Sequence, residues 1–324
     1  MDKQQYDKCI ECGKCTSSCV FLSQYKINIK DYSRMPELAF SCFLCGQCRR
    51  VCPVELDGRQ LSLDLRRQLI DDGHNLYKNG YTSVIVEKKN YLFKNYRHAH
   101  TKTVLFPGCN FTAYYPKTTE ALSRKFEEDF GISTAYDCCG KPIGELGLKD
   151  DEQVIIDRLN QRFDKLGIEE IVVLCPNCYY HLKDRLTVKI TTIYEKMTEL
   201  KMIDQGDGAD MTVFPPCPDR TTKEIFGSIT DMMPQNQVNI LEDIQCCGAG
   251  GCAAVREPDL AKGLRDQFLS ENHEKIYTYC ATCSGMIAKS GARVEHIVCK
   301  LLNITEEPPK GIASLFNRAI HGFR

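Results

Sequence analysis

Cysteines are the residues of this 324-residue chain whose type and spacing could do chemistry, and there are twenty of them. Most fall in tight Cys-x-x-Cys, Cys-x-x-x-Cys or adjacent Cys-Cys groups. A dense disulfide framework is typical of small secreted domains, but no secretory signal pattern opens the chain. Clustered thiolates in a reducing compartment more often bind metal, so we expect a cytoplasmic metal-binding protein.

Two stretches near the N-terminus share the spacing C-x2-C-x2-C-x3-C, "CIECGKCTSSC" and "CFLCGQCRRVCP". In bacterial ferredoxins this run gives three close cysteines to one [4Fe–4S] cluster and the fourth to the other cluster. Zinc is the alternative metal, but two such runs favour iron. Crossed ligation then predicts one cubane cluster on Cys9, Cys12, Cys15 and Cys52, and a second on Cys42, Cys45, Cys48 and Cys19.

The chain repeats itself from residue 103 onward. "TVLFPGC", "DCCGKP" and "IVVLCPNC" are followed by "TVFPPC", "QCCGAGG" and "IYTYCATC", and 28 residues separate the lone cysteine from the pair in each copy. Such agreement indicates an internal duplication. The first set is Cys109, Cys138, Cys139, Cys175 and Cys178, and the second is Cys217, Cys246, Cys247, Cys280 and Cys283.

The adjacent cysteine pairs do not fit the ordinary zinc clamp, in which two residues separate the ligands. Neighbouring side chains of an extended chain point to opposite faces, so both sulfurs can reach one centre only if the backbone turns. Gly140 and Gly248 follow the pairs and permit that turn. Five thiolates also exceed the one per iron that a cubane takes, which favours a cluster that is not a simple cube. Two four-cysteine zinc sites with spare thiols are the alternative.

The elements that must position these cysteines read as strands and helices in alternation. "TVLF", "IVVL" and "TVF" are short apolar runs typical of buried parallel strands, and stretches with helical apolar spacing separate them. This pattern predicts an α/β fold with ligands at the carboxyl ends of the strands, and two copies packed about a pseudo-twofold axis. Before them, leucines at 61, 65 and 69 predict an amphipathic helix that stops at Gly73.

We therefore predict four segments. Residues 1–73 form a mainly α-helical two-cluster ferredoxin domain, and residues 74–100 form a connector on the surface. Residues 101–204 form the first repeat, and residues 205–324 form the second repeat with a C-terminal tail.

On these motifs the second half resembles the duplicated cysteine-rich CCG domain in the catalytic subunit of heterodisulfide reductase. With the ferredoxin domain before it, the whole resembles the fused form, in which one chain carries both parts. The iron–sulfur subunits of glycolate and lactate oxidases and of anaerobic glycerol-3-phosphate dehydrogenase share this plan. The resemblance implies that each five-cysteine set holds a noncubane [4Fe–4S] cluster. It also implies that the pair of clusters cleaves a disulfide between two small thiols.

The predicted function is thus an oxidoreductase subunit that passes electrons from a flavin-containing partner through two cubane clusters to two noncubane clusters. No glycine-rich dinucleotide fingerprint follows a strand, so flavin and NAD(P) are expected on another chain. One alternative is a relay subunit of a FAD-dependent hydroxyacid or glycerol-3-phosphate dehydrogenase. Another is a thiol-based sensor or a structural zinc protein.

Composition limits the remaining partners. The formal net charge is −1, which gives no field to attract nucleic acid, and no apolar run approaches the length of a membrane helix. We expect contact with the inner membrane face only through a partner protein. The tail has an apolar helical stripe that predicts docking on a partner or on the chain's own core, with shallow membrane contact as the alternative. It comprises Ile312, Leu315, Phe316, Ala319, Ile320 and Phe323.

A few further residues have simpler readings. Cys252 and Cys299 fall outside the counted sets and are interpreted as packing thiols. His296 lies among apolar residues and is interpreted as a core histidine, with a proton-donor role as the alternative. Three charged or titratable residues follow cluster cysteines closely and could stabilise cluster charge or deliver a proton, although surface solvation explains them nearly as well. They are Lys141, His181 and Arg220.

Overall fold

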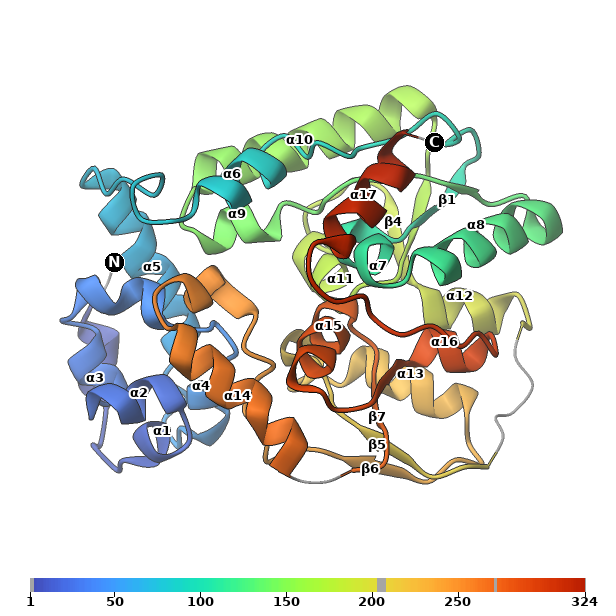
Figure 1. The fold of residues 1–324 in the computed structure, drawn as a ribbon. Coiled ribbons are helices and arrows are strands. Elements are labelled where there is room, and N and C mark those ends of the chain that lie inside the picture. The colour runs from blue at the N-terminus through green and yellow to red at the C-terminus, as the bar shows by residue number, and fades with distance from the viewer. Residues whose placement is uncertain (1–2, 203–207, 271–272, 324) are drawn as a thin grey trace.

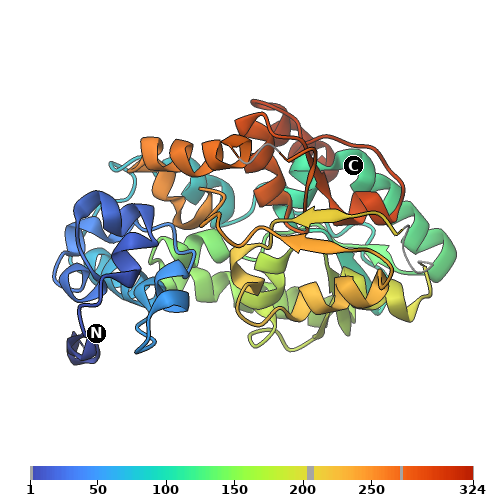
Figure 2. The same ribbon diagram turned by 90° about the horizontal axis from the view of Figure 1, so that it is seen from below.

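The computed structural model describes residues 3–202, 208–270 and 273–323. The predicted boundary between the two repeats, at 204–205, lies outside these residues. Helices of the N-terminal domain lie at one end of the molecule, and the two repeats make up the rest (Figure 1). Seen at 90° to that view, helix α14 (Pro258–Ser270) of the second repeat extends toward the N-terminal helices (Figure 2).

The N-terminal domain is built from helices, as predicted. Its longest helix, α5, covers Gly58–Asp71, and its Leu61 and Leu65 are fully buried. The Asp57 carboxylate begins this helix by accepting the backbone N–H groups of Arg59 and Gln60. The shorter helices are η1 (Lys3–Lys8), α1 (Lys14–Ser17), α2 (Val20–Tyr25), α3 (Ile29–Tyr32), η2 (Pro36–Ser41) and α4 (Gln47–Val51).

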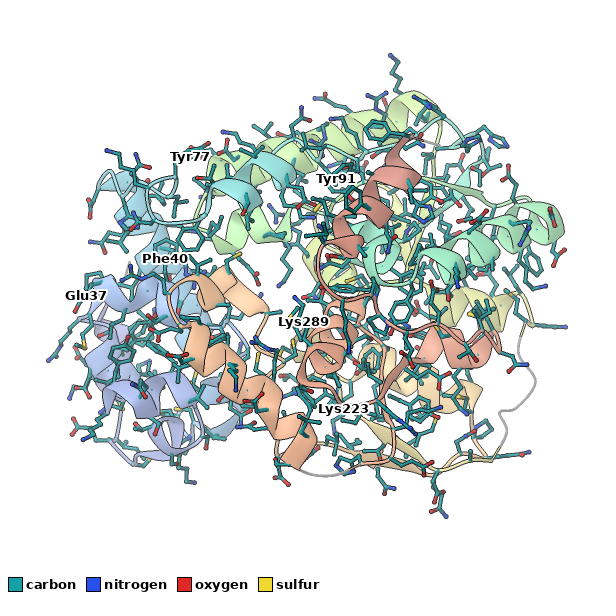
Figure 3. All side chains as sticks on the ribbon, viewed as in Figure 1. Glu37, Phe40, Tyr77, Tyr91, Lys223 and Lys289 are labelled. Carbon is teal, nitrogen blue, oxygen red and sulfur yellow. The ribbon has the colours of Figure 1, made fainter. Side chains whose placement is uncertain are left out.

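The segment predicted as a surface connector is in fact partly packed into the body. It contains helix α6 (Thr82–Lys88), and Tyr81, Ile85 and Tyr91 are buried. Tyr91 lies inside the molecule, whereas Tyr77 lies at its periphery (Figure 3). Asn95 also forms an antiparallel bridge with Tyr136 of the first repeat. The buried aromatic residues of this segment therefore hold it against the body of the protein.

The first repeat is a four-stranded parallel sheet in the order β2-β1-β3-β4, with helices between its strands. The predicted strand "TVLF" is β1, and "IVVL" is β3 shifted by one residue. The elements are β1 (Thr103–Phe106), α7 (Gly108–Tyr114), α8 (Pro116–Phe130), β2 (Ser133–Thr134), α9 (Lys141–Glu145), α10 (Lys149–Leu166), β3 (Glu170–Val173), α11 (Pro176–Leu182), β4 (Lys189–Thr192) and α12 (Ile193–Glu199).

The second repeat has the same topology, a parallel sheet in the order β6-β5-β7-β8. Strand for strand this order matches that of the first repeat, so the duplication seen in the sequence extends to the fold. The elements are β5 (Met211–Val213), η3 (Cys217–Asp219), α13 (Glu224–Met232), β6 (Val238–Ile240), η4 (Gly250–Val255), α14, β7 (Ile276–Thr278), α15 (Ala281–Ser290), β8 (Val294–His296), α16 (Ile297–Leu301) and α17 (Ala313–Phe323).

The two repeats share a hydrophobic core. Phe111 and Tyr115 of the first repeat pack against the ring of His296 in the second, and all three side chains are fully buried. These side chains are buried because the two repeats pack against each other. The repeats therefore form one body, and the carboxyl ends of their strands are held in fixed positions. None of the described helices is long and apolar enough to span a membrane.

Candidate iron–sulfur site

All ten cysteines of the two repeats line one cavity of about 560 Å³. Cys45, Cys52 and Cys252 line the same cavity. The topology explains the convergence, because the lone cysteines and the Cys-x-x-Cys motifs follow the carboxyl ends of parallel strands. Cys175 and Cys280 each stand directly before the helix that follows such a strand, α11 or α15.

Contacts between thiols link the ten cysteines into a continuous series. In the first repeat the order is Cys109, Cys138, Cys139, Cys178 and Cys175. Cys175 then contacts Cys280, its equivalent, and the series continues through Cys283, Cys247, Cys246 and Cys217. Within the described residues no three His, Cys, Asp or Glu side chains surround a single metal-ion position.

The backbone turns at both cysteine pairs, as the sequence predicted. Gly140 and Gly248 have φ values of +80° and +77°, in the left-handed region that favours glycine. A Cβ atom at Gly140 would lie 2.8 Å from Ile155, and one at Gly248 would lie 2.8 Å from the carbonyl oxygen of Ala261. Glycine is therefore required at both places by conformation and by space.

Positive charge lies beside these thiols. Arg49, Arg50, Arg59, Lys141 and Arg220 line the cavity, with Glu55, Asp57 and Glu145 as the carboxylates. Lys141 pairs with Glu145, which lies one turn along α9. Arg220 is 94% buried, yet its Nη2 has no hydrogen-bond partner among the residues that the structure describes. Hydrogen bonds from Cys138 and Cys178 hold the pKa of Cys139 below its usual range, which favours the thiolate form that binds metal.

The N-terminal cysteines gather at two places in the structure, and their crossed ligation of two clusters stays a prediction. Cys9, Cys12, Cys15 and Cys52 line one small cavity. Cys19, Cys42, Cys45 and Cys48 form the other group, and burial together with the neighbouring thiols raises the pKa of Cys48. The thiol of Cys246 also donates a hydrogen bond to Cys45, which connects this second group to the second repeat.

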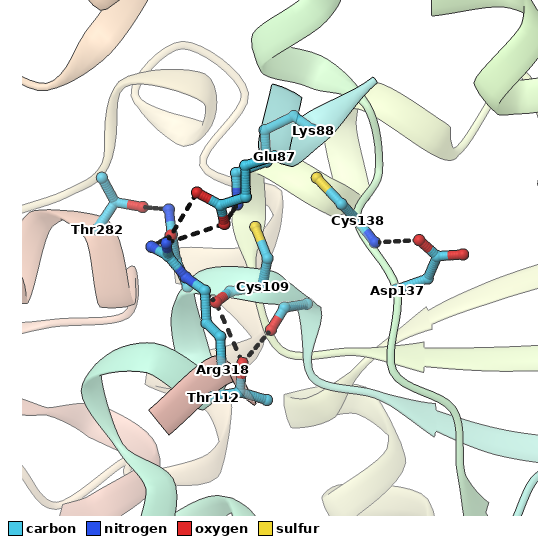
Figure 4. Close-up of polar contacts among 10 residues, drawn as sticks. Glu87, Lys88, Cys109, Thr112, Asp137, Cys138, Thr282 and Arg318 are labelled. Atoms are coloured by element: carbon cyan, nitrogen blue, oxygen red, sulfur yellow. Dashed lines mark hydrogen bonds and ion pairs between the residues drawn. The ribbon is translucent and has the colours of Figure 1, made fainter. Parts of the chain in front are cut away.

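The end of the first thiol series is enclosed by parts of the chain distant in sequence (Figure 4). Arg318 of α17 donates to the carbonyl of Cys109 at 3.2 Å, to Asn110 at 3.0 Å and to Glu87 of α6 at 3.0 Å. Asn110 in turn donates to Thr282 of the second repeat at 2.7 Å. Lys88 is buried beside Cys109 and Cys138 and pairs with Glu87. Two cations therefore flank this group of thiols.

Four further residues from the sequence analysis differ in whether they line the cavity. Cys299 is fully buried outside the cavity against Thr118, as a packing thiol would be. His296 accepts the Val298 N–H, and burial lowers its pKa to about 3, so it is a neutral core residue. His181 lies against Glu152 and Arg185 and does not line the cavity. Cys252 packs against the N-terminal core, in agreement with its interpretation as a packing thiol, and it also lines the cavity.

Sequence reasoning missed three residues that organise the site. Arg66 is fully buried and joins the N-terminal domain to both repeats, through the carbonyls of Ala39, Cys42, Glu145 and Gly251. Gln245 donates to the sulfurs of Cys19 and Cys45, and Arg318 donates to the carbonyl oxygen of Cys109. Gln245 is next to a cysteine pair, which was a usable signal, whereas Arg66 and Arg318 lie in ordinary amphipathic helices.

Comparison with known proteins agrees with this arrangement. Residues 103–183 and 211–288 match the model of the CCG cysteine-rich domain, and residues 8–57 match that of a 4Fe-4S dicluster domain. An uncharacterised iron–sulfur protein of Methanococcus maripaludis is 24% identical over 98% of this chain and 74% of its own length. A subunit of the fumarate reductase (CoM/CoB) of Methanothermobacter marburgensis is 22% identical over 94% of this chain and 72% of its own.

Two further proteins are similar, one in part of its sequence and one in its fold. An EtfAB:quinone oxidoreductase of Syntrophomonas wolfei is 27% identical over 57% of this chain and 30% of its own. A crystal structure of a hypothetical protein from Helicobacter pylori shares the fold with a TM-score of 0.58 and 8% identity, over 91% of this chain and 68% of its own. The chain thus consists of an iron–sulfur dicluster domain followed by two CCG cysteine-rich domains, the composition of an electron-transfer protein.

Proposed function

We propose that this chain is the electron-transfer subunit of a heterodisulfide reductase-like complex. The observation that carries the proposal is that both five-cysteine sets line one cavity, which Cys45 of the dicluster domain also reaches. A partner containing flavin would supply electrons, and a small-thiol disulfide or similar acceptor would receive them at the cavity. Two electrons and two protons convert one disulfide into two thiols.

The residues fit the expected cofactors. Ten cysteine sulfurs around a cavity of about 560 Å³ suit two large clusters better than isolated ions. We assign one noncubane [4Fe–4S] cluster to each five-cysteine set, and two cubane clusters to the crossed N-terminal sets. When bound, such clusters accept and release single electrons. The five cations of the cavity would offset the negative charge of the thiolates.

The symmetry of the cysteines supports a paired site. Cys175 and Cys280 are equivalent in the two repeats and contact each other, which is the arrangement expected on a pseudo-twofold axis. Each repeat would then present its set to the same space from opposite sides. A relative named as a CoM/CoB fumarate reductase subunit supports an acceptor or donor that carries thiols.

Iron analysis of anaerobically prepared protein tests the cofactor assignment. We expect about sixteen irons per chain and little zinc. Cys247→Ser should remove about four irons, whereas Cys299→Ser, outside the cavity, should remove none. Far fewer irons in the unaltered protein, or stoichiometric zinc, would contradict the assignment.

A substrate test distinguishes the reductase from an alternative. Dithionite-reduced protein is mixed with small-thiol disulfides without oxygen, and cluster reoxidation is followed by absorbance. Reoxidation by at least one disulfide is expected. The similarity to an EtfAB:quinone oxidoreductase favours, as the second candidate, a relay between a flavoprotein dehydrogenase and a quinone. Rapid exchange with a flavoprotein and no response to any disulfide would establish that relay instead.

A further inference from the structure

Gln245 bridges the dicluster domain and the second repeat. It stands directly before the Cys246–Cys247 pair and is 5% exposed. Its Nε2 lies 3.4 Å from the sulfur of Cys45 and 3.6 Å from that of Cys19. Both of these cysteines belong to the crossed group that we assign to a single cubane cluster. The side-chain amide of Gln245 therefore connects two sulfurs of this cubane group to the loop that carries Cys246 and Cys247, which we assign to a second-repeat cluster.

The orientation of the amide is fixed by its neighbours. Its oxygen accepts the backbone N–H of Val20 at 2.9 Å, so its NH₂ group must face the sulfurs. The backbone of Gln245 is held as well, because buried Arg220 donates to its carbonyl at 2.7 Å and to that of Pro215 at 2.9 Å. Gln245 is thus a preorganised donor, since reversing the amide would leave the Val20 N–H without its acceptor.

The glycine-rich loop that follows the second cysteine pair also lies very close to the dicluster domain. A Cβ atom at Gly250 would lie 2.2 Å from the carbonyl oxygen of Phe43, and one at Gly251 would lie 2.7 Å from that of Cys42. Arg66 donates to the carbonyls of both Gly251 and Cys42 at 2.8 Å. At these two positions the loop therefore has no space for a side chain against the second cysteine run of the dicluster domain.

The first repeat has a different residue at the equivalent place. Asp137 precedes its cysteine pair, and the carboxylate accepts from Tyr96 at 2.8 Å, from Arg158 at 3.1 Å and from the Cys138 N–H at 2.7 Å. A carboxylate cannot donate to sulfur, and this one is occupied by the connector and by α10. The two repeats therefore differ in how they meet the dicluster domain.

We propose that Gln245 is the positioning residue for electron transfer into the CCG domains, a role that rests on the function proposed above. Its N–H groups would stabilise the more negative, reduced form of the centre on Cys19, Cys42, Cys45 and Cys48, and so raise its reduction potential. Electrons then reach the second repeat before the first. Cys19, Cys42, Cys45 and Cys48 would hold the centre that supplies electrons, and Cys246 and Cys247 would help to hold the centre that accepts them. Each transfer would move one electron and would form or break no bond.

Two variants separate donation from packing. Gln245→Glu keeps an oxygen for the Val20 N–H but has no N–H to donate, and Gln245→Leu loses both interactions. Gln47→Leu is the matched control, because Gln47 is two residues from Cys45 and its side chain accepts from Arg50 instead. Reduction potentials are measured by EPR-monitored titration of the anaerobically prepared full chain, with iron analysis of every sample.

Both Gln245 variants should lower the potential of one cubane centre and leave the other unchanged, with the larger shift in Gln245→Glu because of its added negative charge. Gln47→Leu should give a clearly smaller shift. Equal shifts in all three variants, a shift in Gln245→Leu alone, or equal shifts of both cubanes would overturn the inference. Iron content and disulfide-driven reoxidation of the unaltered protein test the proposed function separately, so the two failures can be told apart.

Discussion

The cysteine-pair regions of the two CCG domains share a strand order and a ligand pattern but have different surroundings. In the second repeat the pair is pressed against the dicluster domain, where Gln245 and Arg66 make the contacts. In the first repeat, Arg318 of the C-terminal helix and Lys88 of the connector flank the thiols. The two repeats are therefore equivalent frames, and segments of the chain outside their sheets give each frame its own neighbours.

This difference indicates a division of labour between the repeats. The second-repeat region has its polar contacts with another redox domain, which suits the transfer of electrons. Buried or mostly buried cations lie beside the thiols of both repeats, Arg220 in the second and Lys88 and Arg318 in the first, and they suit the stabilisation of negative charge during reduction. The first-repeat cations differ in coming from the connector and from α17. Breaking the contacts of one region should leave the other intact, and the following predictions test this separation from the largest expected effect to the smallest.

Arg66→Met should have the largest effect on stability. The guanidinium is fully buried, stacks on Phe40 and donates to four carbonyls in three parts of the chain. Removal leaves these carbonyls without their donor, and a buried acceptor left unsatisfied costs about 1–3 kcal/mol. We expect a clearly lower midpoint of urea unfolding and faster limited proteolysis between the dicluster domain and the repeats.

Arg67→Met is the control for that change. Arg67 is the next residue on the same helix, and its pair with Asp64 is partly exposed. Exposed pairs contribute up to about 1 kcal/mol, so the midpoint should hardly move. A comparable loss in both variants would mean that α5 itself, and not the three-way contact of Arg66, was damaged.

Arg318→Met should have an intermediate effect that is confined to the first-repeat region. Its pair with Glu87 is mostly buried, with side-chain exposures of 13% and 18%. The variant should lose roughly 2–3 kcal/mol, because a buried carboxylate is left with fewer partners. A double-mutant cycle with Glu87→Gln measures the coupling, and the exposed Lys125–Asp129 pair of α8 provides a reference with little coupling.

The same variant sharpens the comparison spectroscopically. The EPR signals of both cubane centres should be unchanged in Arg318→Met, since within the described residues its hydrogen bonds go to Cys109 and Asn110 of α7 and to Glu87 of α6. Altered cubane signals would show that the two regions are coupled, and the proposed division of labour would then be wrong.

Much of this arrangement was readable in the sequence because its determinants are local. Cysteine spacing, Gly140 and Gly248 predicted the turns, and the apolar run "TVLF" predicted β1 to the residue. The same topology in both repeats follows from the repeated motifs. What could not be read are contacts between residues far apart in the chain, such as that of Arg66 with Gly251, 185 positions away. Nothing in an amphipathic helix marks which arginine will be buried.

The connector illustrates the same limit. Its polar composition predicted a surface segment, yet Tyr81 and Tyr91 are buried and Glu87 and Lys88 lie beside the first-repeat thiols. Single aromatic residues in a polar stretch give no period from which burial can be inferred. Tyr81 packs in the N-terminal core beside Phe40, and Tyr91 packs beside Cys109 and Cys138 of the first repeat. Those surfaces form only in the folded chain.

Glu306→Gln should have the smallest effect, again limited to the first repeat. The carboxylate crosses from the segment before α17 to the first turn of α8, where it accepts the N–H groups of Lys117 and Thr118 at 2.9 and 2.7 Å. An anion at a helix N-terminus contributes about 0.5–1 kcal/mol, and the amide keeps part of the hydrogen bonding. The loss should shrink at high salt, because screening weakens the charge term. Exposed Glu307 offers the control: an equal loss in Glu307→Gln would show that overall charge, and not this cap, is responsible, and that the C-terminal segment is not fastened to the first repeat in this way.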